Sequence, residues 1–394
     1  MSAPQEQTAA APVWLAPALA GLAATLLGLG LARFAYTPLL PALVTEGWLS
    51  SSDATYLGAA NLLGYLLGAL IAAPLARRWP ARDILRLAMM LTVISLAACA
   101  WNGGLPWLTF WRVLAGATGA VLIVLAGPTV LASVPKGLKP RAIGVVFSGI
   151  GIGVVLAGFG VPALVPAGLG TVWLALAALA LGLTLLAWRH WPPVIARSER
   201  TEAAPTPKLA PLLLFTLAYA GDGIGYVPHT LFLSDYVARG LGLGVGIGGV
   251  IWAAFGIGAM LGALFGGWLA GRLGFGPAFA LALGVKALAV ALPLGLTAIP
   301  ALALSAFLVG LLTPGSVTLA SGVAASLAGP AGHMAAWGRM TAAFALTQVV
   351  GGYALSALFA AWGDHRPLFA IGAACLAAGA LSALIANHLS RRPS

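Results

Sequence analysis

Long runs of apolar residues, separated by short polar stretches, cover almost the whole chain. A helix that crosses a bilayer needs roughly 20 predominantly apolar residues, and twelve runs approach or exceed this length. They lie near residues 14–43, 54–76, 84–101, 106–134, 142–165, 169–188, 209–235, 245–270, 277–298, 301–328, 335–361 and 367–388. The pattern predicts an all-α membrane protein with twelve transmembrane helices.

The second half of the chain repeats the first at a constant offset of 194 residues. The matching positions are Gly68-Ala69-Leu70 with Gly262-Ala263-Leu264, Arg78 with Arg272, Gly116 with Gly310, Gly144 with Gly338, and Gly158 with Gly352. Parallel hydrophobic halves are typical of transporters whose substrate site lies between the halves at the bilayer midplane. We therefore expect two pseudo-symmetric six-helix bundles, residues 1–188 and 209–394, joined by a polar cytoplasmic linker at 189–208.

The composition places the chain in lipid. Hydrophobic residues make up 61% of the chain and charged residues only 7%, whereas an ordinary soluble domain carries about 25% charge. Neither half contains a soluble domain, so the sequence predicts no enzyme. A gradient or a separate protein would supply the energy for transport. Glycine-rich runs at 149–153 and 244–249 lack the βαβ unit that a dinucleotide site needs. Cys99 and Cys375 lie in apolar segments, so we expect no disulfide, metal or cofactor.

The net charge of +11 is distributed unevenly between the two sides of the predicted membrane. Fifteen of the 20 Lys and Arg fall in the tails and in loops on the side of the N-terminus, while the opposite loops hold only Arg239 and Arg366. The positive-inside rule then places both termini in the cytoplasm. The basic excess reflects this orientation, and no nucleic-acid partner is expected. Residues 1–12 carry Glu6 and no Lys or Arg, so we expect no cleavable signal peptide.

Ionisable side chains within membrane helices are costly, so they mark cavities or polar partners. Removing the loop charges leaves Arg33, Arg112, Asp222, Lys286 and His229. Asp222 is the only carboxylate in this set, so we expect it to carry the coupling proton, with His229 as the next candidate. At about 1.5 Å per residue, Asp222 and Lys286 both lie near the middle of their helices.

The first and seventh predicted helices align locally at an offset of 190, because Tyr36-Thr37-Pro38 matches Tyr226-Val227-Pro228. This alignment brings Arg33 and Asp222 to one central cavity from related helices. Tyr219, Asp222, Tyr226 and His229 are spaced three, four and three apart, so they share one face of a regular helix. The residues expected to bind substrate are Arg33, Tyr36, Asn61, Arg112, Tyr226, His229 and Gln348.

Four short segments carry further motifs. The loop Ala73–Arg82 and its repeat Gly267–Gly274 resemble the signature loop of the major facilitator superfamily, although Arg77 and Gly271 replace its acidic residue. Arg112–Gly119 is similar to that superfamily's Arg-x-x-x-Gly-x-x-Gly motif, and Ala32–Pro41 resembles bacterial permeases of the YbfB/YjiJ type. The resemblance implies a monomeric, multi-pass transporter of the bacterial inner membrane. Its two bundles would rock between outward and inward openings, with gating loops at Arg78, Arg82 and Arg272.

The candidate side chains also have structural interpretations. Arg33 and Asp222 could form an ion pair that only holds the halves together. Lys286 lies in the counterpart of the third helix, which in the resembled superfamily lies at the bundle periphery, so snorkelling or a local structural contact is favoured for it. The other candidates whose polar groups can join helices or act as hydrogen-bonded spacers are Arg112, His229, Asn61 and Gln348.

The charges favour one substrate class. Arg33 and Arg112 against a single Asp222 leave an excess of positive charge, and a guanidinium presents paired donors to a carboxylate. We expect a proton-coupled symporter of a small organic anion that works by alternating access. A proton-driven exporter of amphiphilic drugs or metabolites stays open, although the fifth predicted helix lacks the Gly-Pro pair typical of proton-drug antiporters. A non-transporting membrane receptor or scaffold is the third possibility.

Overall fold

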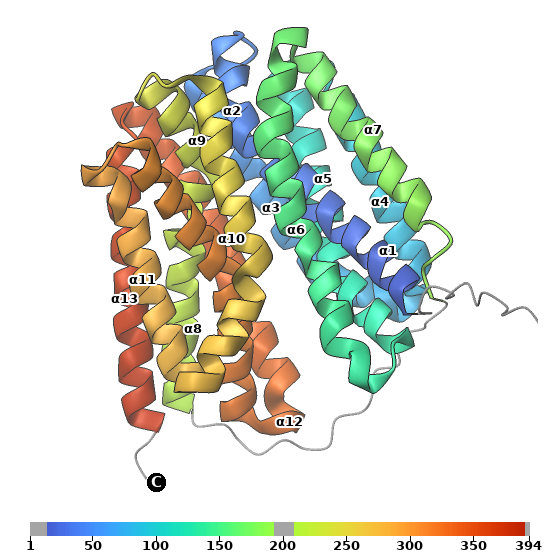
Figure 1. Ribbon diagram of the computed structural model, residues 1–394, viewed down its shortest axis with the longest axis vertical. Coiled ribbons are helices and arrows are strands. Elements are labelled where there is room, and N and C mark those ends of the chain that lie inside the picture. Colours follow the sequence, from blue (N-terminus) through green and yellow to red (C-terminus); the bar gives the residue numbers. More distant parts are fainter. Residues whose placement is uncertain (1–13, 193–208, 391–394) are drawn as a thin grey trace, which may run out of the picture.

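Figure 1 shows a computed structural model of the chain, which describes residues 14–192 and 209–390. Every regular element in these two ranges is helical. The first half contains α1 (Leu15–Thr25), η1 (Leu26–Phe34), α2 (Tyr36–Thr45), α3 (Ser51–Arg78), α4 (Ala81–Ala98), α5 (Gly104–Ser133), α6 (Lys139–Leu164) and α7 (Leu169–Ala187). The second half contains α8 (Leu209–Gly225), η4 (Pro228–Phe232), α9 (Leu233–Asp235), η5 (Tyr236–Gly240), α10 (Gly244–Leu273), α11 (Phe275–Gly295), α12 (Ile299–Trp362) and α13 (Arg366–Ser390).

The membrane spans do not coincide one to one with these elements. The elements α1, η1 and α2 form one span, Leu15–Thr45, and α8 to η5 form another, Leu209–Gly240. The long α12 contains two spans that meet near Gly329. The backbone φ there is 66°, a positive value that glycine adopts more readily than other residues. Most of the predicted linker 189–208 lies outside the described residues.

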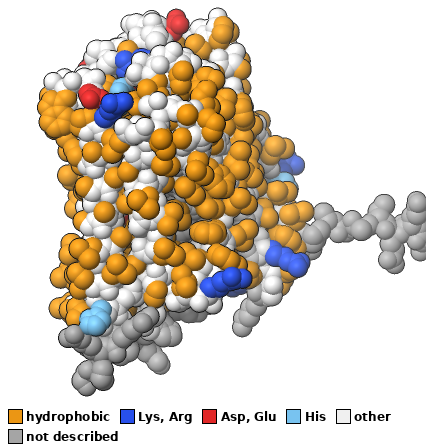
Figure 2. Space-filling view, turned by 60° about the vertical axis from the view of Figure 1, so that its left-hand side comes forward, with side chains coloured by type: hydrophobic (Ala, Val, Ile, Leu, Met, Phe, Trp, Pro, Cys, Tyr) orange, Lys and Arg blue, Asp and Glu red, His pale blue; other side chains and the backbone are white. Residues whose placement is uncertain are grey.

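The structure confirms the predicted all-α architecture. Eleven helical segments of the described chain are long and apolar enough to cross a membrane. The remaining predicted span is α4, whose 18 residues include Arg82, Asp83 and Arg86 and are therefore less apolar. Helix boundaries agree with the predicted runs to within several residues. Hydrophobic side chains cover most of the face shown in Figure 2, as expected for a surface in contact with lipid.

The internal repeat appears as equivalent close contacts in the two halves. A Cβ atom at Gly116 would collide with the carbonyl oxygen of Asn61, and one at Gly310 would collide with that of Phe255. Asn61 and Phe255 are themselves separated by the repeat offset of 194. Small residues let membrane helices approach closely, so these glycines allow α3 to pack on α5 and α10 to pack on α12 in the same way.

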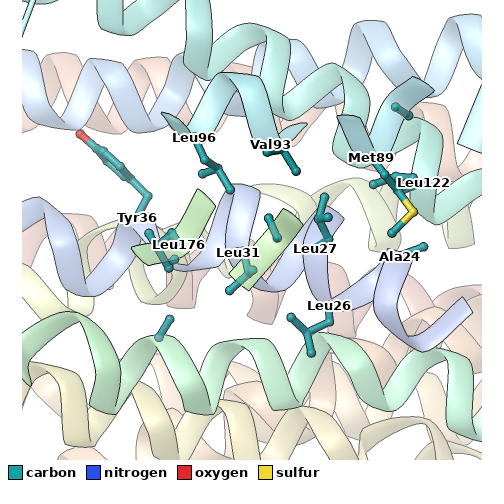
Figure 3. Packing of buried hydrophobic residues seen from close by; sticks show 14 of the residues in the cluster. Ala24, Leu26, Leu27, Leu31, Tyr36, Met89, Val93, Leu96, Leu122 and Leu176 are labelled. Atoms are coloured by element: carbon teal, nitrogen blue, oxygen red, sulfur yellow. The ribbon is translucent and has the colours of Figure 1, made fainter. Parts of the chain in front are cut away.

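The buried hydrophobic residues form two clusters, and most members of each cluster come from one half. Figure 3 shows part of the first cluster, in which Leu27 and Leu31 of η1 lie near Met89 and Leu96 of α4. Leu122 of α5 joins the same cluster. The first span is thus enclosed by other helices, and its polar residues point into protein instead of lipid.

The two halves touch mainly at one end of the molecule. We name the end where α7 stops and α8 starts the linker end, and the end with loops 46–50 and 241–243 the distal end. In their distal parts α6 and α10 are in close contact, since a Cβ on Gly158 would lie 2.7 Å from the Gly249 carbonyl oxygen. Towards the linker end the two helices diverge (Figure 1), and Gly144 and Gly267 have open space around them. The structure is therefore closed at the distal end.

Candidate functional site

Arg33 lies where the first span departs from regular α-helical geometry. The span widens into the π-helical segment η1, and Arg33 occupies its last turn. Gly30 in the same segment permits a close approach to α6, because a Cβ there would lie 2.7 Å from the Gly153 Cα. Such π-helical turns are frequent at functional sites in helices. The irregular turn directs Arg33 towards the second half of the molecule.

The guanidinium of Arg33 is surrounded by aromatic residues. Its Nη2 donates a hydrogen bond of 2.8 Å to the Tyr226 hydroxyl, across the interface between the halves. Its Cζ lies 5.1 Å from the centre of the Phe34 ring and 5.2 Å from that of Tyr65. Within the described residues no carboxylate forms an ion pair with Arg33. The alternative of an Arg33–Asp222 ion pair is therefore wrong for this structure.

Arg112 is held more tightly, within the first half. Its Nη1 donates to the Ala32 carbonyl at 2.6 Å, and its guanidinium lies 4.6 Å from the centre of the Tyr36 ring. Asn61 Nδ2 donates to the Arg112 carbonyl at 2.9 Å. These bonds join η1, α3 and α5, so the structure gives Arg112 and Asn61 helix-joining contacts. Arg112 Nε and Asn61 Oδ1 are nevertheless buried without a protein partner.

A small cavity beside the two arginines lies at the contact between the halves. Four of the expected substrate-binding residues line it: Arg33, Tyr36, Asn61 and Arg112. The other lining residues come from both halves and are Thr37, Gly58, Leu62, Thr230 and Leu231. Its volume is about 20 Å³, counted as space for the centres of water-sized molecules, which is enough for about one water. The cavity is lined by two cationic side chains and no anionic one. In this closed form it is positively charged and too small for an organic solute.

Asp222 pairs with Lys286. Lys286 Nζ lies 2.7 Å from Asp222 Oδ1, and the exposed fractions of the two side chains are 0% and 1%. The expectation that Lys286 snorkels is wrong. The alternative expectation, a local structural contact, is confirmed by its ion pair with Asp222. Lys286 Nζ also lies 5.0 Å from the centre of the Tyr226 ring. The negative charge of Asp222 is thus balanced inside the second half and does not neutralise Arg33.

Tyr226 connects the two sets of charges. Its hydroxyl accepts hydrogen bonds from Arg33 Nη2 and from Gln348 Nε2. Its ring faces Lys286, which in turn holds Asp222. A series of direct contacts therefore runs from the buried ion pair of the second half to the arginine of the first half.

His229 lies off the face that holds Tyr219, Asp222 and Tyr226. Pro228 has no N–H to donate to the preceding turn, and the helix widens into η4 at this residue. His229 Nε2 lies 2.7 Å from Ser305 Oγ, which donates its own proton to the Ala289 carbonyl at 2.6 Å. The imidazole thus points into the second half and not into the cavity, as in the spacer interpretation.

The basic residues of the predicted gating loops form local contacts. Arg82 pairs with Asp83 at 3.4 Å on an exposed surface. The guanidinium of Arg272 lies 4.6 Å from the ring centre of Trp268 on the same helix. Arg78 is exposed. None of the ion pairs found among the described residues crosses between the halves at the linker end.

One polar cluster was not predicted from the sequence. Asp235 is fully buried in the span Leu209–Gly240, so Asp222 is not the only intramembrane carboxylate. Asp235 accepts two hydrogen bonds from Arg239, at 2.5 and 2.6 Å, and lies 2.8 Å from His365 Nε2. Arg239 Nη1 also donates to Ser51 Oγ at 2.6 Å, across the distal end. The i, i+4 spacing of Asp235 and Arg239 was the available signal.

A bundle of twelve helical spans in two repeated halves, with buried charges where the halves meet, defines a membrane transporter of the major facilitator type. The chain belongs to this superfamily. The family model described as "Uncharacterised MFS-type transporter YbfB" matches residues 25–385. This match confirms the resemblance that the sequence motifs indicated.

Individual proteins show the same relationship. A chloramphenicol resistance protein of Streptomyces lividans is 30% identical over 299 residues, which cover 72% of each chain. Among solved structures, a D-xylose–proton symporter superposes with a TM-score of 0.73 at 16% identity, covering 95% of this chain and 96% of its own. A bacterial homologue of the human lysosomal transporter Spinster, in an inward-facing and occupied conformation, gives 0.72 at 16% identity over 98% and 100%. At such identities the structural similarity concerns the fold alone.

Proposed function

We propose that this protein is a secondary active transporter that moves a small carboxylate together with protons. The observation that carries the proposal is the charge balance at the interface between the halves. Arg33 and Arg112 line the cavity with no ionic partner in the described residues, while Lys286 balances Asp222. A buried, uncompensated cation is costly, and an anionic substrate would neutralise it. The charge therefore favours an organic anion over a cation or a sugar.

Arg33 is the better anchor of the two. Arg112 is only 1% exposed, and a short bond to Ala32 holds its guanidinium. Arg33 is 8% exposed and donates one N–H to Tyr226, and among the described residues no other acceptor for its guanidinium is found. A guanidinium can bind a carboxylate through two parallel hydrogen bonds. We assign Arg33 the carboxylate of the substrate, and Arg112 the positioning of η1 and the positive field.

Asp222 is the coupling residue of the proposal. When Asp222 takes up a proton, Lys286 loses its ionic partner and can move relative to the Tyr226 ring. Because the Tyr226 hydroxyl accepts the hydrogen bond of Arg33, a movement of Tyr226 would change the donors that Arg33 can offer to an anion. Protonation of Asp222 and binding of the anion at Arg33 would then favour each other. The basic loops favour a cytoplasmic linker end by the positive-inside rule, and with that orientation this form would be an inward-facing one.

Transport by reconstituted protein tests the proposal. Purified protein in liposomes would be offered labelled acetate, succinate and benzoate, with and without an inward proton gradient. Weak acids also enter protein-free liposomes in their uncharged form, so the protein-free rate is subtracted. We expect protein-dependent accumulation of at least one of these anions that is lost on collapsing the gradient with a protonophore. Equal accumulation in protein-containing and protein-free liposomes would contradict the proposal.

The relative from Streptomyces lividans supports a second candidate, export of a neutral amphiphilic drug. It is described as a chloramphenicol resistance protein and is 30% identical to this chain. Under this candidate, Asp222 would exchange protons for drug and Arg33 would be structural. Labelled chloramphenicol in the same liposomes distinguishes the two. Its movement against a gradient, driven by protons and insensitive to Arg33→Ala, would favour the exporter.

A further inference from the structure

A column of four aromatic rings in the second half ends at Arg33 of the first half. Trp337 stacks on Tyr219, Tyr219 stacks on Phe344, and Phe344 stacks on Tyr226. The three centroid distances are 5.8, 4.5 and 5.6 Å, and the interplanar angles are 26°, 23° and 23°. The Tyr226 hydroxyl at the end of the column accepts the hydrogen bond from Arg33. We infer from this column that the transported anion carries an aromatic ring, as an aryl carboxylate does.

The column is built from two helices with the same spacing. Tyr219 and Tyr226 are seven residues apart on the span that begins with α8, and Trp337 and Phe344 are seven apart on the second span of α12. Seven residues are close to two helical turns, so each pair lies on one face. The rings of the two helices alternate along the column. Gln348, one turn beyond Phe344, donates to the same Tyr226 hydroxyl and continues the stripe.

The rings differ in accessibility. Tyr219 and Tyr226 are buried, whereas Phe344 and Trp337 are only partly buried and keep part of each ring accessible. On the first half, Tyr65 is also partly buried, and its ring lies 5.2 Å from the Arg33 guanidinium. Arg33 thus has aromatic neighbours from both halves, Phe34 and Tyr65 on one side and Tyr226 on the other. Accessible ring surface and spare guanidinium donors lie next to each other.

This arrangement fits a solute with two different ends. Aromatic rings attract one another in stacked or edge-to-face geometry beyond the burial of their area. A ring on the substrate would pack against Phe344, which stacks on the Tyr226 ring that Arg33 contacts, while its carboxylate binds Arg33. Trp337 lies at the far end of the column. An aliphatic anion would keep the ionic contact and lose the ring contact. The inference rests on the proposed anion transport and adds to it the chemical class of the substrate.

The experiment compares benzoate with cyclohexanecarboxylate, which has the same charge and a similar size without aromaticity. Binding of each anion to purified full-length protein is measured by competition against labelled benzoate and by calorimetry. We expect benzoate to bind roughly 2-fold to 13-fold more tightly, the range of an aromatic pair. Phe344→Leu should reduce this preference, and Phe344→Tyr should retain it. Trp337→Leu, at the far end of the column, should change it less than Phe344→Leu. Phe159→Leu removes a ring from the exposed surface of α6 and should leave the preference unchanged.

The outcomes separate this inference from the function on which it rests. Equal affinity for the two anions, with both weakened by Arg33→Ala, would overturn the aromatic inference and leave anion transport standing. Binding of neither anion, together with tight binding of chloramphenicol, would overturn the proposed function. A benzoate preference that survives in Phe344→Leu would place the ring elsewhere and contradict the assignment to this column. Thermal unfolding of each variant shows that it is folded before its affinity is interpreted.

Discussion

Lys286 Nζ lies 2.7 Å from Asp222 Oδ1, and neither side chain is exposed to solvent by more than 1%. The two residues come from α11 and α8 and are separated by 64 positions in the sequence. In a buried ion pair each charge depends on the other to offset its desolvation. Removing one residue of the pair leaves the other charge buried without a partner, so the effect of the pair on the free energy of unfolding can be measured.

The first prediction concerns the stability of this pair. Lys286→Met leaves Asp222 buried without its cation, and removing one partner of such a pair costs about 3 to 5 kcal/mol. We expect a clear fall in the thermal unfolding temperature in detergent. The double variant Lys286→Met with Asp222→Leu removes both charges and should recover most of the loss. A double variant as unstable as the sum of its single variants would show that the two residues do not act as a pair.

The second prediction concerns coupling. Asp222→Asn keeps the shape of the side chain and removes its ability to exchange a proton. The other polar groups near it are Lys286 on α11, and Tyr219 and Tyr226 on its own span. We expect the variant to lose accumulation driven by a pH gradient while it still exchanges labelled for unlabelled substrate down a concentration gradient. Full gradient-driven accumulation would move the coupling site to the Asp235 cluster or to His229.

The sequence predicted the architecture well because hydrophobicity along a membrane span is a local property. Each run of about 20 apolar residues must form its own hydrogen bonds in lipid, and a helix does this within one segment. The repeat offset of 194 also predicted spatial equivalence, as the contacts of Gly116 with Asn61 and of Gly310 with Phe255 demonstrate. Only α4, with three charged residues near its start, falls short of the composition of the other spans.

The ion pairing could not be predicted from spacing. Asp222 and Lys286 lie on different helices, and which faces these helices turn to each other depends on tertiary packing. Their equal depth in the membrane was a usable signal, but the peripheral position expected for the helix of Lys286 argued against it. His229 was misplaced for another reason. The expected stripe assumed a regular helix, and the widening at Pro228 rotates the residues that follow it.

The third prediction concerns the contact that closes the distal end. Arg239, held by Asp235, donates to Ser51 across the halves at 2.6 Å. Ser51→Ala removes only the cross-half bond, and Arg239→Gln removes the charge as well. A hydrogen bond to a charged group is worth about 1.5 to 3 kcal/mol, so the ratio of closed to open forms should fall roughly 10-fold to 150-fold. This range is an upper bound for Ser51, since water can replace its hydroxyl.

Spin labels on the exposed residues Glu46 and Leu243, which belong to opposite halves at the distal end, measure this opening. Pulsed dipolar distances should lengthen in Ser51→Ala and more strongly in Arg239→Gln. Ser52→Ala, next to the contact on α3 but not part of it, serves as the control. Distance distributions that are identical in all four proteins would contradict a role for this contact in closure.

The last prediction separates an anion anchor from a structural link at Arg33. Arg33→Lys keeps the charge but loses the planar fork that binds a carboxylate through two bonds, and Arg33→Ala loses both. Losing a hydrogen bond to a charged group costs about 1.5 to 3 kcal/mol, which is roughly 10-fold to 150-fold in affinity. We expect Arg33→Lys to weaken carboxylate binding, and Arg33→Ala to weaken it further, in protein that stays monodisperse.

Tyr226→Phe provides the matched control, because it removes the only hydroxyl to which Arg33 donates within the described residues and leaves the guanidinium in place. If Arg33 only joins the halves, Tyr226→Phe and Arg33→Ala should lower thermal stability alike, with little effect on affinity. If Arg33 binds the anion, Tyr226→Phe frees another N–H, so affinity should persist or rise while Arg33→Ala lowers it. Opposite effects of the two variants on affinity can arise only when the guanidinium itself contacts the substrate or its field attracts it. Arg33→Lys then decides between contact and field, since a field alone would survive the exchange of one cation for another.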